Sequence, residues 1–421
     1  MRVLIVNASE KTGGAAIAAS RLKEALINHG VKAKMLVRKK EDDNLSVVGL
    51  KGQFRQRLNF LCERLMIWKN NGYRREGLFD IDTGWLGTDI TSLPEFQEAD
   101  IIHLHWVNQG FLSLQNINKI LRKGKPIVWT MHDMWPFTGI CHYAHDCENY
   151  LTVCRNCRLL AHPGEKDLSY RVFKRKEQLL SSSNMVFVAC SKWLAEEANK
   201  SFLLRGKLIE DIPNPINSRL YYPHDKEKSR QKCRLPLNKK LILFSAYRTT
   251  LPIKGLNYLI EACRLCAEAH PETKDQYAIV AVGKDADLIA DKFPYPVYSM
   301  GYIEDERKMA EIYKACDVFV IPSLQDNLPN TIVEAMSCGV PCVGFKVGGI
   351  PQMIDSGVDG FLADARDVVG LQEGIEWVLE KCNYEEVSKT AYAVAMKNYS
   401  EHQVALRYIE IYNQLCKKRY E

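Results

Sequence analysis

Short apolar runs alternate with segments of helical periodicity along the whole chain. The runs are rich in β-branched residues and span 2–7, 33–37, 100–106, 126–133 and 185–191, then 241–247, 277–283, 297–303, 317–323 and 341–347. Near-continuous apolar runs of this kind are typical of parallel strands that helices cover on both faces. The pattern therefore predicts an α/β protein with two doubly wound, Rossmann-like sheets.

The segment 212–225 separates the two sets of runs and contains Pro213, Pro215 and Pro223, which disfavour helix. We therefore predict a first domain over 1–215 and a second over 216–399. The remaining stretch, 400–421, has apolar residues at helical spacing. It is predicted to form a helix that crosses back onto the first domain or packs on the second.

Composition narrows the class of protein. The chain has 421 residues, of which 46% are hydrophobic, and a net charge of +6, so it can form two domains of roughly 200 residues. This charge is too weak to indicate nucleic acid as a partner. Because no apolar run has the ~18 residues of a membrane helix and the N-terminus lacks signal-peptide features, we expect a cytoplasmic protein with mostly reduced cysteines.

Two acids mark the most informative segment, residues 323–339. Asp326 and Glu334 lie at the mouth of a helix that follows the strand 318–322 and that Pro329 can open. Backbone N–H groups near Asn327 and Leu328 and the positive helix end favour a phosphate.

Glu334, about one turn into this helix, can hydrogen-bond two vicinal hydroxyls, as on a ribose. The segment therefore suits a nucleotide sugar, with Asp326 near a second polyol. The alternative is that Asp326 only caps the helix and Glu334 is a surface acid.

Two cations, Arg248 and Lys254, follow the strand 241–247. Ligands of open α/β sheets bind at the carboxyl ends of strands, and an Arg and a Lys there can neutralise a diphosphate. Solvated surface charges are the alternative.

These motifs resemble the donor-binding domain of glycosyltransferase family 4, in which an Arg, a Lys six residues later, and two Glu separated by seven residues recur. The resemblance continues to residues 359–363 and covers essentially all of the second half of the chain. Within it, Gly348 and Gly349 would let the backbone approach the ligand closely or would form a plain turn. Asp326 stands where the first Glu is usual.

The resemblance implies a GT-B fold of two facing Rossmann-like domains, a nucleoside-diphosphate-sugar donor and retention of anomeric configuration. It places Glu334 on the ribose and Asp326 on the donor sugar. Arg248, Lys254 and the helix end would stabilise the departing diphosphate in place of a metal, so we expect no cofactor in catalysis.

The first half carries candidates for the facing wall. Gly14 opens a helix after the first strand. The turn lacks a GxGxxG pattern, which disfavours a dinucleotide site. In the family that the chain resembles, the equivalent glycine turn touches the donor phosphates or the acceptor. His132 ends the strand 126–131, where the resemblance gives it a role in positioning the reacting sugar, and Asp133 would orient acceptor hydroxyls. His103 and His105 share a strand, and we expect them to face opposite sides, with His105 on the acceptor side.

Four cysteines, Cys141, Cys147, Cys154 and Cys157, fall close together with two histidines between them. A structural zinc site, inert thiols and disulfides are the three interpretations. The segment resembles a cysteine-bearing loop found in some capsule- and exopolysaccharide-building members of the family.

Residues 51–75 contain seven basic residues and one acid. We favour a helix of the first domain that buries its apolar stripe; the alternative is peripheral contact with a membrane that carries a lipid-linked acceptor. Two Asp-x-Asp triplets, 80–82 and 285–287, are interpreted as chance.

The predicted function is transfer of a hexose from a nucleoside-diphosphate sugar to a hydroxyl of a glycan or polyprenyl-linked acceptor, in cell-surface polysaccharide synthesis at the inner face of the membrane. The alternatives are a sugar-nucleotide epimerase or phosphorylase of the same fold, and a non-catalytic sugar-nucleotide-binding assembly protein. An NAD-dependent oxidoreductase is disfavoured by the missing fingerprint.

Overall fold

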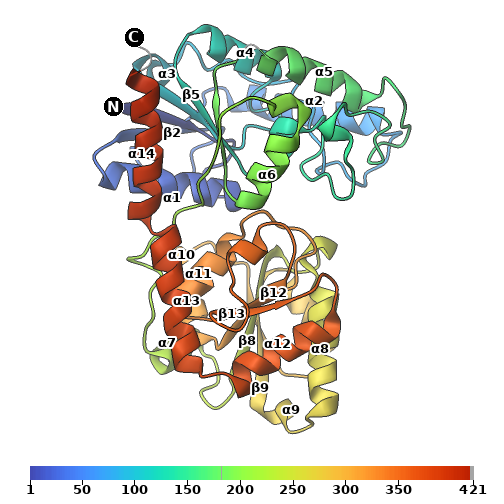
Figure 1. The fold of residues 1–421 in the computed structure, drawn as a ribbon, viewed down its shortest axis with the longest axis vertical. Helices are drawn as coiled ribbons and strands as arrows, with labels where there is room; N and C mark the ends of the chain where they lie inside the picture. Colours follow the sequence, from blue (N-terminus) through green and yellow to red (C-terminus); the bar gives the residue numbers. More distant parts are fainter. Residues whose placement is uncertain (182, 418–421) are drawn as a thin grey trace. The chain divides into compact units, whose positions relative to one another are not determined.

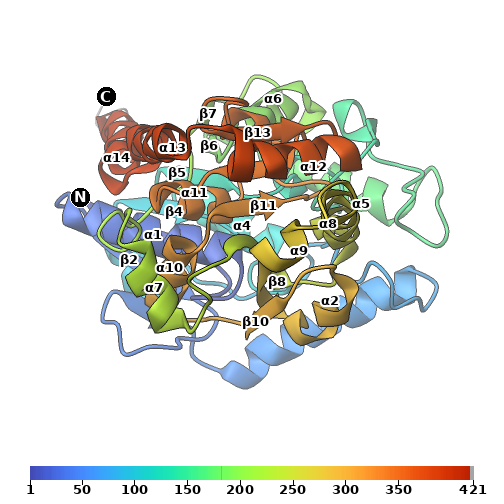
Figure 2. The same ribbon diagram turned by 90° about the horizontal axis from the view of Figure 1, so that it is seen from below.

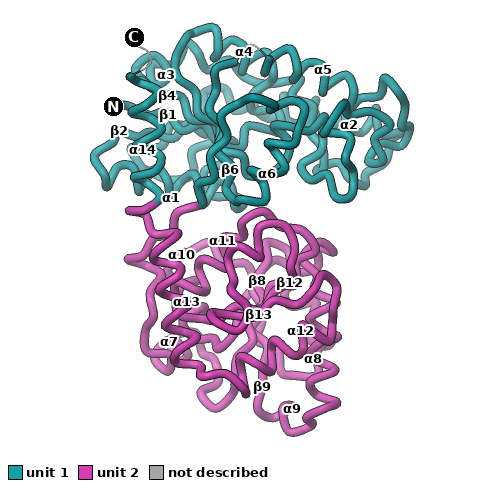
Figure 3. The backbone as a smooth tube through the Cα atoms, viewed as in Figure 1, with its two compact units in different colours: residues 1–213, 404–421 teal, residues 214–403 magenta. Residues whose placement is uncertain are grey.

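The computed structural model describes residues 1–181 and 183–417. The chain divides into two compact units (Figure 3). Unit 1 is Met1–Pro213 with the chain from Val404 onward, and unit 2 is Asn214–Gln403. Each unit holds a parallel sheet that helices cover (Figure 1), so the predicted α/β class with two doubly wound domains is confirmed.

Unit 1 contains a seven-stranded sheet with the order β3-β2-β1-β4-β5-β6-β7. Its strands are β1 (Arg2–Val6), β2 (Lys32–Val37), β3 (Val47–Gly49), β4 (Ile101–Leu104), β5 (Ile127–Met131), β6 (Val186–Ala189) and β7 (Ile209–Asp211). Its helices are α1 (Gly14–Asn28), α2 (Gln53–Asn70), α3 (Pro94–Glu98), α4 (Leu114–Arg122), α5 (Leu168–Ser181), α6 (Lys192–Lys200) and α14 (Glu401–Lys417), the last from Val404 on.

Strand β1 shows why these runs read as continuously apolar. Val3 and Ile5 belong to one buried cluster, and Leu4 and Val6 to another on the opposite face, because successive side chains of a strand point to opposite faces. Helices α1 and α14 contribute to the first cluster, and α4, α5 and α6 to the second. The C-terminal helix therefore returns to the first domain, one of the two placements predicted.

Unit 2 contains a six-stranded sheet with the order β10-β9-β8-β11-β12-β13. Its strands are β8 (Lys240–Arg248), β9 (Tyr277–Lys284), β10 (Val297–Gly301), β11 (Val318–Ile321), β12 (Cys342–Phe345) and β13 (Gly360–Ala363). Its helices are α7 (Lys226–Cys233), α8 (Leu256–Ala269), α9 (Thr273–Gln276), α10 (Glu306–Ala315), α11 (Asn330–Ser337), α12 (Val368–Glu376) and α13 (Tyr384–Tyr399).

Neighbouring β8 and β11 pair in parallel, Val318 beside Ile242 and Phe319 beside Leu243. Their carboxyl ends therefore meet at the same edge of the sheet. In unit 1, the neighbours β4 and β5 do the same. These two edges carry most of the predicted site residues.

Candidate active site

In unit 2, the loops after β8 and β11 are joined to each other. The Lys254 ammonium lies 2.7 Å from Asp326 Oδ2, and the Leu324 amide donates to the Ile253 carbonyl at 2.8 Å. Gly255 has φ +69°, and a Cβ there would lie 1.8 Å from the Pro322 carbonyl oxygen, so the close approach requires glycine. Lys254 and Asp326 are thus brought together from positions 72 residues apart.

Gly348 supports the same loop from its other side. It has φ +53°, and a Cβ there would lie 1.9 Å from the Asp326 carbonyl oxygen. Gly349 donates its amide to that oxygen at 3.2 Å. The close approach predicted for this glycine pair is therefore made to the backbone of Asp326, which fixes where the Asp326 side chain begins.

Glu334 is buried on α11, so the alternative of a surface acid is wrong. Its Oε2 accepts a hydrogen bond from the Tyr313 hydroxyl of α10 at 2.9 Å. Burial and the charge of Glu334 raise the pKa of Tyr313, which keeps this hydroxyl a donor. Helix α11 begins at Asn330 with Pro329 as its N-cap, one residue outside the first helical position that was predicted.

The other donor-side residues differ in exposure. Asn327 and Leu328 are buried in the loop before α11, whereas Arg248 is half-exposed, with its Nε 3.4 Å from Asp285 Oδ2. Asp285 was not predicted as a site residue, because its Asp-x-Asp triplet was interpreted as chance. The available signal was its position just after β9, the strand beside β8.

Two polar atoms of this loop are buried without a hydrogen-bond partner, Ser323 Oγ and Gln325 Oε1. Buried polar atoms in native proteins almost always have partners. Their position beside Asp326 indicates a place where a polar ligand can supply the missing hydrogen bonds.

In unit 1, two of the predicted histidines contact each other at the ends of β4 and β5. His105 Nδ1 and His132 Nε2 are 2.9 Å apart, and His132 Nδ1 lies 3.5 Å from Cys190 Sγ. Burial lowers the pKa of His132 to about 4 and that of His105 well below its ordinary value. Both rings are neutral near pH 7, and the buried Nε2 of His105 has no partner.

The expectation that His103 and His105 face opposite sides is wrong. Their ring centroids are 4.3 Å apart, because residues two apart on a strand point to the same face. His103 is fully buried, and its Nδ1 lies 2.6 Å from the Tyr412 hydroxyl of α14. Thr130 on β5 contacts both His103 Nε2 and the Tyr408 hydroxyl. Polar contacts thus hold α14 beside the two site strands.

Asp133 has a different set of partners from the acceptor hydroxyls predicted for it. Its Oδ1 accepts from the Trp135 amide, and its Oδ2 from the Trp106 indole at 3.0 Å. His142 Nδ1 also lies 2.7 Å from Oδ2. Asp133 therefore positions His142 and Trp106, and its contact with acceptor hydroxyls stays a prediction.

His142 continues this contact to a second acid. Its Nε2 lies 2.9 Å from Asp82 Oδ2, and Asp82 also pairs with Arg64 of α2. Burial lowers the pKa of His142, but the charges of Asp133 and Asp82 and their hydrogen bonds outweigh it and raise the pKa to about 10. A buried chain of alternating charge, Arg64–Asp82–His142–Asp133, thus ends beside His132; sequence reasoning missed Asp82 and His142.

Comparisons with known proteins bear on the family and the fold. A family model described as "Glycosyltransferase Family 4" matches residues 12–220, and one described as "Glycosyl transferases group 1" matches residues 238–381. The chain belongs to the group 1 glycosyltransferases.

Two curated relatives show how far this likeness extends. The D-inositol 3-phosphate glycosyltransferase of Thermobispora bispora is 24% identical over 282 residues, 64% of this chain and 59% of the relative. WcaC of Escherichia coli, named for colanic acid biosynthesis, is 26% identical over 263 residues, 58% of this chain and 59% of WcaC. The match thus spans less than two thirds of either relative.

Solved structures match nearly the whole chain. Sucrose-phosphate synthase from Thermosynechococcus elongatus has a TM-score of 0.68 at 17% identity, with 99% of each chain covered. HepE from Anabaena, solved with UDP-glucose, has a TM-score of 0.64 at 18% identity and covers 98% of this chain and 100% of its own. The fold of this glycosyltransferase is therefore of the two-domain GT-B type.

The glycine turn of this glycosyltransferase has the predicted place. Gly13 is the N-cap of α1 with φ +92°, and Gly14 is the first residue of the helix. A Cβ at Gly13 would meet nothing within 4 Å, so the positive φ rather than close packing favours glycine there. Contact of Gly14 with donor or acceptor stays a prediction.

The four cysteines of the 141–157 loop are free thiols, which excludes the disulfide interpretation for this structure. Burial raises the pKa of Cys157 to about 12 and raises that of Cys141 and Cys154. Within 1–181 and 183–417, no group of three or more His, Cys, Asp or Glu side chains is arranged to hold a metal. The geometry thus does not fit the four-thiolate zinc site, which was one of the three interpretations of the spacing.

Helix α2 contradicts the interpretation favoured for 51–75, that its apolar stripe is buried. Phe54, Leu58, Leu61 and Leu65 are exposed, whereas Gln56, Glu63 and Arg64 are buried. Hydrophobic periodicity identified the apolar face correctly but not the direction in which it points. No described helix is long and apolar enough to cross a membrane.

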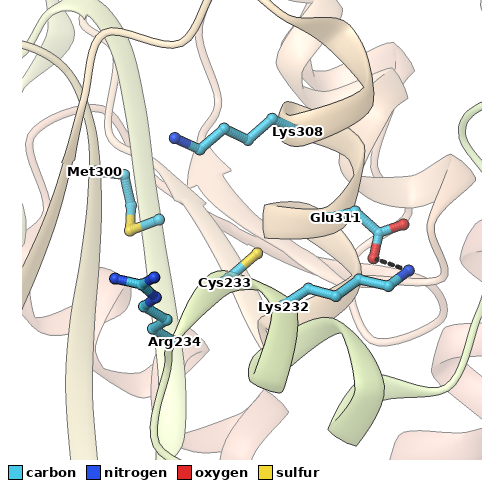
Figure 4. Close-up of a pocket in the computed structure, with 6 residues that line it drawn as sticks. All are labelled: Lys232, Cys233, Arg234, Met300, Lys308 and Glu311. Atoms are coloured by element: carbon cyan, nitrogen blue, oxygen red, sulfur yellow. Dashed lines mark hydrogen bonds and ion pairs between the residues drawn. The ribbon is translucent and has the colours of Figure 1, made fainter.

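A surface pocket of about 380 Å³ lies elsewhere in unit 2 (Figure 4), lined by Lys232, Cys233, Arg234, Met300, Lys308 and Glu311. None of the predicted site residues lines it. Lys232 and Glu311 form an ion pair across one side. We assign the candidate site to the strand ends, because Lys254 and Asp326 are paired there beside the unpartnered Ser323 Oγ and Gln325 Oε1.

Proposed function

We propose that this chain transfers a sugar from a nucleoside-diphosphate sugar to a hydroxyl of a glycan or lipid-linked glycan, with retention of configuration and without a metal. The observation that carries the proposal is the loop 323–328, where Asp326 is paired to Lys254 and Ser323 and Gln325 have buried polar atoms without partners. HepE, of similar fold, was solved with UDP-glucose.

Each donor-side residue then has a role. Lys254 and Arg248 stabilise the negative charge that develops on the departing diphosphate, where fixed positive charge lowers the barrier most. The backbone near Asn327 and Leu328, at the positive end of α11, takes a phosphate. Glu334 holds the ribose, and its hydrogen bond from Tyr313 fixes the orientation of the carboxylate. Asp326 contacts the donor sugar.

The histidines of unit 1 suit hydroxyl groups. A neutral imidazole both donates and accepts a hydrogen bond, and the low pKa values of His132 and His105 keep both rings neutral near pH 7. We assign His132 to the reacting sugar and His105 to the acceptor side. The unpartnered His105 Nε2 supports this assignment.

The acceptor we favour is a glycan carried on a lipid such as a polyprenyl diphosphate, in cell-surface polysaccharide synthesis at the inner face of the membrane. Similarity to WcaC, named for colanic acid biosynthesis, supports this context.

The test is a thermal-shift panel of nucleoside diphosphates and their sugars, with and without EDTA. A ligand at 100 times its Kd stabilises the folded state by about 2.7 kcal/mol, which is several degrees of melting temperature. We expect one diphosphate to stabilise the protein equally with chelator, and Lys254→Ala or Glu334→Gln to abolish the shift. Lys346→Ala and Glu373→Gln, both exposed in unit 2, are the matched controls.

Two outcomes contradict parts of the proposal. If no nucleoside diphosphate raises the melting temperature, the donor class is wrong; if EDTA removes the shift, the metal-free chemistry is wrong. Release of free diphosphate must also depend on an acceptor glycan. Isomerisation of the donor without acceptor would indicate an epimerase, and binding without release a non-catalytic protein.

A further inference from the structure

Helix α2, light blue in Figure 2, has a burial pattern that is the reverse of the one expected for a surface helix: polar side chains are buried and apolar ones are exposed. Phe54, Leu58, Leu61 and Leu65, here called the α2 stripe, are 82%, 47%, 52% and 58% exposed. Their spacing of four, three and four residues places them on one side of the helix. An ordinary surface helix turns such a stripe toward the core, so this contiguous exposed face requires an explanation.

Polar contacts hold the helix in this orientation. Gln56 Nε2 donates to Thr88 Oγ1 at 2.7 Å, and Arg64 pairs with the buried Asp82. Glu63 Oε1 accepts from the amides of Thr83 and Gly84, both at 3.0 Å. Rotation of α2 to bury the stripe would leave these buried groups unpaired, at a high cost. The outward stripe is therefore a fixed surface.

The exposed charges between Lys51 and Arg75 have one sign. Six exposed basic residues lie on α2 or next to its ends: Lys51, Arg55, Arg57, Lys69, Arg74 and Arg75. The one acid between Lys51 and Arg75 is Glu63, which is buried. Glu76, just beyond Arg75, is an exposed acid, so the surface combines apolar side chains with an excess of positive charge.

We propose that the α2 stripe docks this protein on the surface of a membrane that contains anionic phospholipid. A helix with an apolar face and a basic border lies in the plane of the lipid interface, with its apolar side chains among the acyl chains and its cations near the phosphates. A second copy of the chain is a poorer occupant, because its α2 would bring the same positive charges to the contact.

The inner face of the same helix leads to the acceptor-side residues. Arg64 begins the buried chain Arg64–Asp82–His142–Asp133, which ends next to His132. The docking helix and these residues therefore belong to one packed unit. The biological purpose of docking rests on the proposed function. Docking would bring the protein to the membrane, where a lipid-carried acceptor is presented.

The test is co-sedimentation of the full chain with vesicles of phosphatidylcholine alone or with 30% phosphatidylglycerol. We expect at least tenfold stronger partitioning onto the anionic vesicles, and weaker partitioning as NaCl is raised, because salt screens surface charge. The double variant Leu58→Glu/Leu61→Glu is expected to lose at least tenfold, as is Arg55→Glu/Arg57→Glu. Leu288→Glu, at a leucine of unit 2 that is 69% exposed, should bind as the unaltered chain does.

The outcomes separate this proposal from the proposed function. Equal binding of the unaltered chain and the leucine variant, or no preference for anionic vesicles, overturns the docking. Loss of a solution dimer in the leucine variant, seen by size-exclusion chromatography, overturns it in favour of self-association. The diphosphate thermal shift of each variant serves as a check of folding, and it should be unchanged; its absence in every protein would instead reject the donor assignment.

Discussion

The buried imidazolium of His142 makes the stability of unit 1 depend on pH. Its pKa is about 10 in the folded protein and close to 6.5 in the unfolded chain. A group whose pKa is raised by folding contributes its full stability below the unfolded pKa and loses it as pH rises through the folded pKa. Because one pKa unit corresponds to about 1.4 kcal/mol, the contribution of His142 below pH 6.5 is about 5 kcal/mol.

The expected loss is about 1.4 kcal/mol per pH unit between pH 6.5 and pH 10. From pH 7 to pH 9 this is about 3 kcal/mol, or about 6–12 °C in melting temperature for a unit of this size. The groups that face His142 are Asp82 and Asp133, with Arg64 and Lys176 behind them.

The assay compares melting temperatures of the unaltered chain and His142→Gln between pH 6.5 and pH 9, followed by a signal from unit 1. Subtracting the two curves removes contributions from other titrating groups. His162→Gln, at an exposed histidine of unit 1, is the matched control and should follow the unaltered chain. If His142→Gln fails to fold, the ring nitrogens of His142 in the intact protein can be titrated by NMR.

Parallel melting curves for the unaltered chain and His142→Gln would refute this reasoning. So would an NMR titration in which His142 loses its proton below pH 7. Either result would mean that burial dominates over the two carboxylates, and Asp133 would then be held by Trp106 and the Trp135 amide alone.

Two further predictions concern single contacts. Gly348→Ala should weaken diphosphate binding and lower the melting temperature of unit 2, because its Cβ would lie 1.9 Å from the Asp326 carbonyl oxygen. The control is Gly357→Ala: Gly357 has φ +84° and nothing within 4 Å of an added Cβ, so this variant bears only the backbone strain of about 1–2 kcal/mol. Equal effects of the two substitutions would contradict the clash at Gly348. Tyr412→Phe removes the hydroxyl that lies 2.6 Å from His103 Nδ1. It should lower the free energy of unfolding, measured by chemical denaturation, by about 1–3 kcal/mol, whereas Tyr73→Phe, at an exposed tyrosine, should leave it unchanged. No difference between the two variants would mean that α14 is held by its apolar residues alone.

The strands that the sequence predicted and those that it missed differ mainly in their position in the sheets. All ten predicted runs are strands, and nine of them lie inside the two parallel sheets, where burial on both faces gives continuous apolar sequence. The tenth, β10, is an edge strand that is only partly buried. The three missed strands, β3, β7 and β13, lie at the edges of the two sheets. They have only three or four residues each and are partly buried, so each gives too short an apolar run to be recognised.

The candidate site was visible where its residues follow strand ends in the sequence. Arg248, Lys254, Asp326, Glu334 and His132 could be named this way. The pairing of Lys254 with Asp326 could not, because it depends on β8 and β11 being neighbours although 72 residues separate the two side chains. Asp82 was missed for a similar reason, since its partner His142 is 60 residues away.

Contacts between residues far apart in the sequence also explain why the expectation for α2 was wrong. An amphipathic pattern shows which face of a helix is apolar, but burial of the opposite face depends on partners in distant loops, here Thr83, Asp82 and Thr88. Because these partners bind the polar side chains, the orientation of the helix is set by its inner face rather than by the outward residues. Exposed leucines of α2 can therefore change without disturbing Asp82 or His142, and membrane docking and donor binding can be tested as independent properties of one folded chain.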